Sequence, residues 1–521
     1  MRFARSVTII ILILLSCLRF FKFLVHRNKL IDINHVSTDK KVVLIVMDSI
    51  MDAPLQLALK EGKLPALQFL LQKGRYYPDM VSSYPTMSVC VDSSLLTGKY
   101  PDKHKVPALV WYNEKQKRFI SYGSDKKEIF KLGPKRVLHE SLFHLNLDHL
   151  RDDLKTIHEE LHDRGLQSAS INTLVYRGYT RHRLTVPILL KTFRFLPPVA
   201  FVRAPAYFSY GMLCKLNPRN KHTRLWEGFG FNDKFAAKEF EYLIEHNRVP
   251  SFSIVYFSDN DKKVHKEGVL QTKGLEADDL LLQSILNKYE SWDQALDDTI
   301  WIVMGDSGQT AVIKDKDEAL IDLRKLLNEY KIHRITGPIQ EQDQIVLGLN
   351  ERMCFIYILD PAVKLETIAN ILQQDGRIDI IAWKEERTVN VISGGKNGIF
   401  SFTPGGEYVD EYGQQWEING ELDLLNLKLE GDGRIVFGDY PDALARLYSS
   451  FYSHEGNYLA VNAYPGFEFV GEGSPTHTGG GSHGSLHKQD SFFPLIVAGT
   501  DLEPKHRRII DLKEWIMKIL E

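Results

Sequence analysis

The apolar positions of the chain follow two patterns, short continuous runs and longer stretches with helical spacing. Four runs consist almost wholly of β-branched, aliphatic and aromatic residues, which predicts buried strands. They lie at residues 42–47, 252–257, 299–304 and 492–498. Helical spacing of apolar residues occurs at 53–73, 152–164, 234–246, 275–289 and 320–331. Strands that alternate with helices in this way predict an α/β protein with a mainly parallel sheet covered on both faces.

Changes in composition divide the chain further. A main domain is expected over residues 41–500, after an N-terminal segment at 1–40 and before a C-terminal amphipathic helix at 501–521. Residues from about 165 to 226 interrupt the domain as a basic cap insertion. A strand–helix–strand pattern followed by an acidic, Gly-rich, hairpin-like stretch predicts a small α+β appendage at about 350–440.

The basic cap stands out by its charge. Between Arg164 and Trp226 the chain has no acidic residue, and its basic residues alternate with aromatic ones. Four readings stay open: a solvated cover of the core, attraction to anionic lipid headgroups, attraction to a phosphate-bearing substrate, and, more weakly, contact with single-stranded nucleic acid. The prolines at Pro187, Pro197, Pro198 and Pro205 argue against one long amphipathic helix.

The N-terminal segment indicates membrane targeting. Arg2 and Arg5 precede an apolar run at residues 7–18, as in segments that enter a membrane-insertion pathway. The run is shorter than the roughly 20 residues that span a bilayer, and Arg19 interrupts its continuation. A single uncleaved anchor is the first expectation, a cleaved signal that releases a secreted protein is the second, and an apolar arm packed on the domain is the third.

The overall composition is that of a folded globular protein. Of the 521 residues, 44% are hydrophobic and 25% are charged. Lys and Arg number 65 against 67 Asp and Glu, which argues against a general nucleic-acid binder, and no sequence-specific nucleic-acid binding is expected. The 4 cysteines make no C-x-x-C spacing, so neither a disulfide scaffold nor a Cys-based zinc site is indicated.

Acidic and imidazole side chains flank all four predicted strands. Three strands are followed by such residues and the fourth is preceded by a glycine-rich segment with histidines. The residues concerned are Asp48, Asp261, His265, Asp306 and His483, with His477 and His487 beside the last. Each is unremarkable alone, since Asp after a strand is often a cap or a turn residue. Together they form the carboxylate and imidazole set that binds zinc or a similar divalent ion.

A further segment, SSYPTMSVCVDSSLLTGKYPDKH, carries a resemblance to a known family. Its Y-P-T-x-S element ends at Ser88, and T-G-x-x-P follows at the family's spacing. The chain thereby resembles the alkaline phosphatase superfamily, in its type I phosphodiesterase and nucleotide pyrophosphatase branch. The resemblance implies a three-layer sandwich around a mainly parallel sheet, and it implies Ser88 as the nucleophile, with Thr86 as the alternative.

The resemblance also implies two divalent metal ions. Asp261, His265 and His483 correspond to the ligands of one ion. The ligands of the other ion correspond to Asp48, Ser88 and Asp306, with Ser307 where the family has a histidine. Zinc is expected, but a serine hydroxyl replaces an imidazole poorly, so the second site is expected to favour Mn or Mg, or to recruit another histidine such as His104.

A metal-dependent hydrolase of phosphate esters is therefore the first functional expectation. Within this class, a phosphodiesterase that acts through a covalent phospho-serine is favoured. The substrate ester stays open between a nucleotide, a lipid headgroup and a glycan phosphate. Met87 and Leu109 replace the Lys and Asn usual in nucleotide pyrophosphatases, while Asn113 is a candidate hydrogen-bond donor to the phosphoryl group. Two alternatives remain: a membrane transferase of phosphoethanolamine or phosphoglycerol, and a degenerate protein that binds a phosphorylated ligand without turnover, which Ser307 favours.

Overall fold

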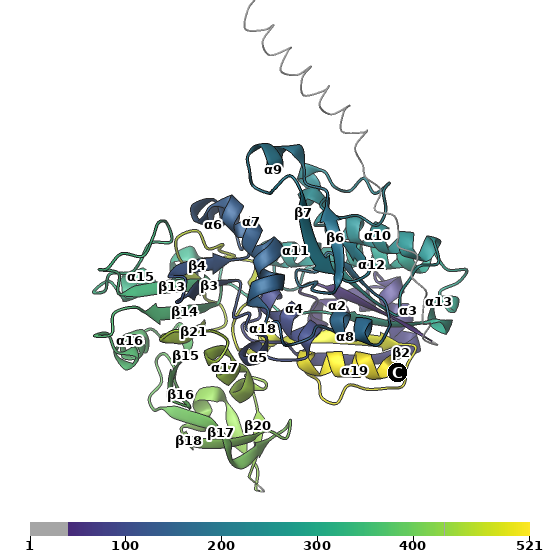
Figure 1. Ribbon diagram of the computed structural model, residues 1–521. Helices are drawn as coiled ribbons and strands as arrows, with labels where there is room; N and C mark the ends of the chain where they lie inside the picture. The colour runs from purple at the N-terminus through teal and green to yellow at the C-terminus, as the bar shows by residue number, and fades with distance from the viewer. Residues whose placement is uncertain (1–39, 432) are drawn as a thin grey trace, which may run out of the picture.

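A computed structural model describes residues 40–431 and 433–521 (Figure 1). Its main sheet has 7 strands in the order β2-β24-β10-β1-β9-β5-β8. Their bounds are β1 Lys41–Met47, β2 Gly74–Val81, β5 Ser168–Ile171, β8 Tyr207–Ser209, β9 Phe252–Phe257, β10 Thr299–Met304 and β24 Phe492–Ala498. β1 pairs in parallel with both β9 and β10, whereas β24 runs antiparallel to β10. The four predicted strands are thus confirmed as neighbours in a mainly parallel sheet.

Helices cover both faces of this sheet, which confirms the three-layer arrangement. Alternate residues of β1 enter two different cores: Val42 and Leu44 pack on one side, Val43 and Ile45 on the other. The first side is covered by α4 (Ser88–Thr97), α8 (Ile157–Asp163) and α19 (Leu512–Ile519). The second side is covered by α3 (Pro65–Lys73), α10 (Asp233–Glu245) and α12 (Lys273–Leu286). Because both faces are buried, the strands read as continuous apolar runs.

Several of the predicted helices were wrong in extent. The stretch 152–164 forms an α-helix only at Ile157–Asp163, and the C-terminal stretch 501–521 only at Leu512–Ile519. The stretch 53–73 forms two helices, α2 (Asp52–Lys60) and α3, because Gly62 adopts a φ of 68° and Pro65 starts a new helix. The stretch 320–331 contains the strand β12 (Leu320–Asp322) and the short helix α15 (Leu323–Leu326). Here parallel pairing of β12 with β22 (Glu468–Val470) overrides the helical spacing.

A second sheet of 9 strands lies beside the main body and includes the region of the predicted appendage (Figure 1). In chain order its first strand is β13 (Ile345–Asn350) and its last is β21 (Tyr458–Ala463). The helices α16 (Leu365–Leu372) and α17 (Ala443–Phe451) lie between these strands in the chain. Its other strands are β14 Met353–Ile358, β15 Ile378–Glu385, β16 Thr388–Ile392, β17 Phe400–Asp410, β18 Gln415–Gly420, β19 Leu427–Leu429 and β20 Arg434–Phe437. One of its two cores includes Tyr84 and Tyr100, so the sheet packs directly on the segment that contains Ser88.

The predicted basic cap at about 165–226 is not wholly an insertion, because its strands β5 and β8 belong to the main sheet. The stretch between these two strands, which keeps the name cap, contains a hairpin. Its strands are β6 (Thr180–Leu184) and β7 (Ala200–Ala204), and the connection contains the short helix α9 (Ile188–Thr192). The predicted anchor or signal at residues 1–40 lies, apart from Lys40, outside the described residues. Within the described residues, no helix is long and apolar enough to cross a membrane.

Several short elements connect these layers. They are β3 Val110–Asn113, β4 Arg118–Ser121, α5 Pro101–His104, α6 Lys126–Leu132, α7 Pro134–His139, α11 Asp259–Glu267, α13 Gln294–Asp297, α14 Lys316–Ala319, β11 Thr310–Ala311, β23 Gly481–Ser482 and α18 Lys488–Ser491. The chain leaves β1, β9 and β10 at the carboxyl edge of the parallel sheet, and it enters the antiparallel β24 from that same edge. This edge is where open α/β sheets place their ligands.

Candidate active site

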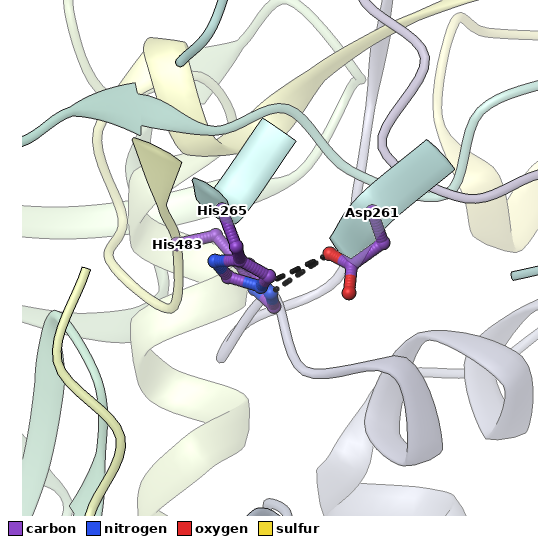
Figure 2. A group of neighbouring side chains, drawn as sticks. All are labelled: Asp261, His265 and His483. Atoms are coloured by element: carbon purple, nitrogen blue, oxygen red, sulfur yellow. Dashed lines mark ion pairs between the residues drawn. The ribbon is translucent and has the colours of Figure 1, made fainter. Parts of the chain in front are cut away.

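Asp261 and His265 lie one turn apart on α11 and face each other. Nε2 of His265 is 3.1 Å from Oδ1 of Asp261, and Nε2 of His483 is 3.8 Å from the same oxygen (Figure 2). The ligand atoms of these three residues all lie within 4.8 Å of one another. Two imidazoles and a carboxylate that converge in this way form a donor set suited to zinc or a similar divalent ion. The predicted first ligand set is therefore brought together.

Both imidazoles are fixed by hydrogen bonds from their other nitrogen. Nδ1 of His265 donates to the carbonyl oxygen of Gly481 at 2.8 Å, and Nδ1 of His483 donates to that of Thr86 at 2.6 Å. Such bonds leave Nε2 as the atom available for a metal, and they fix the orientation of the ring. The partners come from the glycine-rich loop and from the segment before Ser88, so distant parts of the chain orient the pair.

The electrostatics of this cluster favour a cation. Burial acts to raise the pKa of Asp261, but the charge and hydrogen bond of His265, together with the charge of His483, outweigh it and lower that pKa. Burial acts to lower the pKa of His265, but Asp261 and then Glu351 raise it to about 10. The carboxylates of Asp261 and Glu351 thus stabilise a positive charge at this position, and a divalent ion would supply such a charge.

The carboxylates of Asp48 and Asp306 share a hydrogen-bond partner, Tyr256. The hydroxyl of Tyr256 lies 2.8 Å from Oδ2 of Asp48 and 3.1 Å from Oδ2 of Asp306, and the backbone N–H of Ser49 donates to Oδ1 of Asp306. Burial, followed by the charges of Asp306 and Asp261, raises the pKa of Asp48 well above its ordinary value. Two buried carboxylates held this close need a positive charge if both are to ionise, and this requirement fits a cation between them.

Ser307 and Gln309 follow Asp306 in the chain. Ser307 is buried, and its backbone N–H donates to Oδ1 of Asp306 at 2.8 Å. The amide Nε2 of Gln309 donates to Oδ1 of Asp261 at 2.7 Å and to Oγ of Ser49 at 2.9 Å. Gln309 thus links Asp261 to the residue that follows Asp48.

Ser88 and Thr86 differ in how their hydroxyls are placed. Ser88 is the first residue of α4 and is half-buried. Thr86 is fully buried, and its Oγ1 accepts the backbone N–H of Gly484 at 2.7 Å. That bond gives the Thr86 hydroxyl a structural role. Ser88 is thus the more exposed of the two residues.

A second group of metal-binding type adjoins the first. The ligand atoms of His265, Glu351 and His477 also lie within 4.8 Å of one another, and the rings of the two histidines stack at 4.0 Å. Glu351 accepts from the hydroxyl of Ser482 at 3.0 Å, and Nδ1 of His477 lies 3.2 Å from Oε2 of Glu468. These contacts extend the polar cluster into the second sheet.

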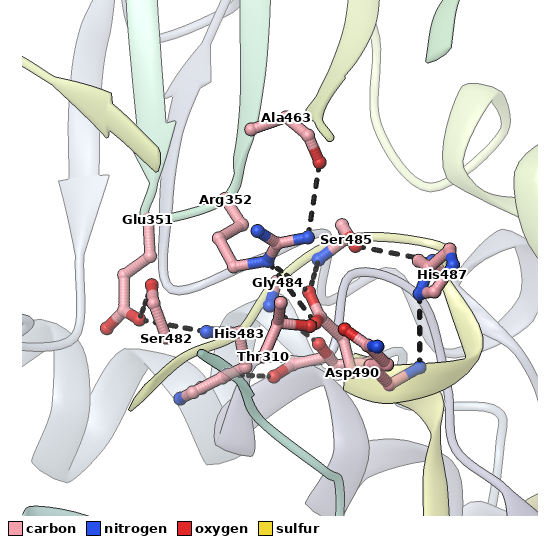
Figure 3. A network of polar contacts seen from close by, with 12 residues as sticks. Thr310, Glu351, Arg352, Ala463, Ser482, His483, Gly484, Ser485, His487 and Asp490 are labelled. Carbon is pink, nitrogen blue, oxygen red and sulfur yellow. Dashed lines mark hydrogen bonds and ion pairs between the residues drawn. The ribbon is translucent and has the colours of Figure 1, made fainter. Parts of the chain in front are cut away.

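The glycine-rich loop is held by a buried ion pair (Figure 3). Nε of Arg352 lies 3.0 Å from Oδ2 of Asp490, and both side chains are fully buried. The same oxygen of Asp490 accepts the backbone N–H of Ser485 at 2.8 Å, while the backbone N–H of Arg352 donates to the carbonyl of His483 at 3.0 Å. The pair thereby positions His483 from both sides.

Sequence reasoning missed several residues of this centre: Ser49, Tyr256, Gln309, Glu351 and Asp92. Only Gln309 left a local signal, the polar run that follows Asp306. Asp92 lies on α4 one turn after Ser88, and its Oδ1 is buried with no hydrogen-bond partner in the part of the chain described. Burial, and then Asp306, raises the pKa of Asp92 to about 8.

Two residues proposed from the sequence lie apart from the cluster. Oδ1 of Asn113 accepts the backbone N–H of Gln116 in the β3–β4 turn, and Asn113 lines a separate cavity of about 640 Å³ with Trp111. His104 is not free to complete the second metal site. Its Nε2 lies 3.0 Å from Oγ of Ser94, and its Nδ1 accepts the backbone N–H of Val106.

Comparisons with known proteins identify the family of the chain and proteins of similar fold. The family model of type I phosphodiesterase / nucleotide pyrophosphatase matches residues 42–387. Human ectonucleotide pyrophosphatase / phosphodiesterase 5 is similar in structure, with a TM-score of 0.54 at 12% identity over 92% of this chain and 95% of that chain. An inactive form of the murine protein, in complex with AMP, has a TM-score of 0.53 at the same identity and coverage. No curated protein sequence matches the chain.

Proposed function

Because the chain belongs to the type I phosphodiesterase / nucleotide pyrophosphatase family, a family of hydrolases, we propose that it is a metal-dependent phosphodiesterase. The observation that carries the proposal is the convergence of Asp261, His265 and His483 at the carboxyl edge of the sheet. Family membership indicates the reaction class, and the donor set indicates how phosphoryl chemistry is supported. The second donor set, Asp48, Ser88 and Asp306 with Ser307 beside them, is proposed for a second ion.

Bound divalent ions would neutralise charge on the phosphoryl oxygens and lower the pKa of a hydroxyl group. The proposed role of Ser88 is to attack phosphorus from the start of α4, so that the Oγ–P bond forms while the bond to one ester oxygen breaks. The proton lost by the Ser88 hydroxyl is balanced by the proton that the leaving oxygen takes up to depart as an alcohol. Water then hydrolyses the Oγ–P bond, which releases a phosphomonoester and restores the Ser88 hydroxyl. Tyr256 holds Asp48 and Asp306 in place, and Thr86 holds the glycine-rich loop against the nucleophile segment.

A nucleotide-type ester is the proposed substrate class, supported by the family and by the AMP complex of a structural neighbour. Met87 and Leu109, which replace the Lys and Asn of nucleotide pyrophosphatases, leave lipid-headgroup and glycan esters in the proposal. Residues 1–40 are proposed as a membrane anchor, or as a secretion signal if they are cleaved, on their sequence pattern alone.

Hydrolysis of bis-p-nitrophenyl phosphate by the purified full chain tests the proposal. EDTA is expected to abolish the activity, and Zn, Mn or Mg is expected to restore it. Product analysis with and without an acceptor alcohol separates hydrolysis from transfer of a phosphoalcohol group. Retained metal binding without turnover of any ester would favour the degenerate binder, for which Ser307 is the main support.

A further inference from the structure

The β6–β7 hairpin of the cap has a core of its own. Leu184, Val186, Leu196 and Val202 are buried on its inner side, where they pack in one cluster with Tyr176. Strand pairing runs along the whole hairpin, from Thr180 opposite Ala204 to Leu184 opposite Ala200. Figure 1 shows α9 at the far end of this hairpin, away from the two sheets. The tip is thus held in place by packing and by a ladder of backbone hydrogen bonds.

The outer side of the same tip is apolar. No residue of α9 is buried, and the side chains of Ile188 and Leu189 are 55% and 66% exposed. In the loop that follows, Phe193 is 67% exposed and Val199 is 48% exposed. Large apolar side chains that gather on a protruding surface mark an interaction site. We call these four residues the apolar tip.

Positive charge lies on the apolar tip and along the strands that lead to it. Lys191 and Arg194 lie in the connection that forms the tip, whereas Arg181, Arg183 and Arg203 lie on β6 and β7, and all five side chains are exposed. Since the chain has no acidic residue between Arg164 and Trp226, these charges have no neighbour of opposite sign within the cap. Arg181 lies over the ring of Phe201 at 3.7 Å, so the contact of this guanidinium is aromatic. The tip therefore combines exposed apolar side chains with two cations of its own.

We propose that the apolar tip docks on the surface of an anionic lipid bilayer. The side chains of Ile188, Leu189 and Phe193 enter the boundary between headgroups and acyl chains, while Lys191 and Arg194 contact the lipid phosphates. A convex tip with exposed apolar residues fits a deformable lipid surface, and its charge complements anionic headgroups. This contact is independent of residues 1–40 and of the reaction that the protein catalyses.

An environment-sensitive label at the tip tests this contact in the full chain. Phe193→Cys is labelled with a nitrobenzoxadiazole dye in a Cys17→Ser background, because Cys90, Cys214 and Cys354 are buried. Leu429→Cys, 40% exposed in the second sheet, carries the same dye as the matched control. Each protein is mixed with phosphatidylcholine vesicles, with or without phosphatidylglycerol.

The dye at position 193 is expected to shift to the blue and to be quenched by doxyl-labelled lipid only when phosphatidylglycerol is present. Lys191→Gln and Arg194→Gln are each expected to weaken this response roughly fivefold, and salt is expected to reduce it. No change at position 193, or an equal change at position 429, overturns the proposal. If the dye at position 193 emits further to the blue than the dye at position 429 before vesicles are added, another segment of the chain covers the tip. This result also overturns the proposal.

A variant without labels provides a second measurement. Ile188→Ser with Leu189→Ser removes two exposed side chains, so the melting temperature and the ester hydrolysis in solution are expected to stay unchanged. The extra sedimentation that phosphatidylglycerol causes over pure phosphatidylcholine vesicles is expected to fall relative to the unmodified chain, whereas an anchor at residues 1–40 would act on both kinds of vesicle. Unchanged sedimentation together with an unchanged dye response at position 193 would exclude the tip as the contact.

Discussion

Nδ1 of His483 donates to the carbonyl oxygen of Thr86 at 2.6 Å, which ties a metal-ligand candidate to the segment that carries Ser88. A second bond runs between the same two segments, from the backbone N–H of Gly484 to Oγ1 of Thr86. The loop that carries His483 and the segment that carries Ser88 are therefore joined by two hydrogen bonds. This connection shapes the first prediction.

Ser88→Ala is expected to lower kcat by at least about 10³-fold, because the hydroxyl that attacks phosphorus is lost. Metal content measured by mass spectrometry is expected to change little at the Asp261 site. Thr86→Val is the matched comparison, and it is expected to lower the free energy of unfolding by about 1–2 kcal/mol because Gly484 loses its acceptor. If Ser88→Ala stays active and Thr86→Val does not, Thr86 is the nucleophile.

Asp261→Asn is expected to abolish tight binding of the first metal ion, since the carboxylate is the only anion between His265 and His483 in their ligand set. Isothermal titration with Zn measures the loss. Glu267→Gln, an exposed change at the end of the same helix, serves as the control and is expected to leave the affinity unchanged. Equal affinities in both variants would place the ion elsewhere.

Ser307→His is expected to raise the zinc affinity of the second position, because an imidazole replaces a weak hydroxyl ligand beside Asp306. The stoichiometry of bound zinc measures the change, and circular dichroism checks that the buried site accepts the larger side chain. Ser307→Ala is the control. No gain in bound zinc in a folded Ser307→His protein would mean that another residue already completes the site.

Gly480→Ala is expected to weaken metal binding by about 10-fold or more, an effect typical of changes in the groups that support metal ligands. A Cβ at Gly480 would lie 1.9 Å from the carbonyl oxygen of His265, so the loop and α11 must separate. Gly376→Ala, where a Cβ meets nothing within 4 Å, is the control. Zinc titration of both variants gives the comparison, and unchanged affinity in Gly480→Ala would argue against this close packing.

Asp379→Asn is expected to stabilise the protein at pH 8 and to have little effect at pH 4. Burial raises the pKa of Asp379 from 3.8 to about 6, although the hydroxyl of Tyr440 donates to it. Because folding raises the pKa of Asp379, the folded protein binds the proton of this carboxyl group more tightly than the unfolded chain does. The resulting contribution to stability is fully present below pH 3.8, the unfolded pKa, and is lost as the pH rises through about 6. The expected gain in the free energy of unfolding at pH 8 is at most about 3 kcal/mol.

Urea unfolding at both pH values measures this difference. Asp317→Asn, the same substitution at an exposed position, is the control. A gain for Asp379→Asn that is equal at both pH values would exclude the burial of its charge as the cause.

The apolar runs were sufficient to predict four of the seven strands of the main sheet, and the family resemblance was needed to group Asp261, His265 and His483. The four runs can be read as buried strands because both faces of a parallel sheet are covered. Asp48 follows β1 directly, Asp306 follows β10 after one residue, and Asp261 lies in the helix α11 that follows β9. Helix bounds were predicted less well. At residues 320–331, pairing with a strand far along the chain decided the structure of β12.

From sequence alone the alternation of buried strands with helices could be predicted, and the acidic and imidazole side chains beside the strands could be singled out, because periodicity and motif spacing are local properties of a chain. The order of the strands in the sheet could not. The folded structure was needed to show that Thr86 is engaged by Gly484, that both nitrogens of His104 are occupied, and that Glu351 and Gln309 contact the cluster. These facts depend on hydrogen bonds and distances between segments far apart in sequence, and such contacts leave no periodic signal in the chain.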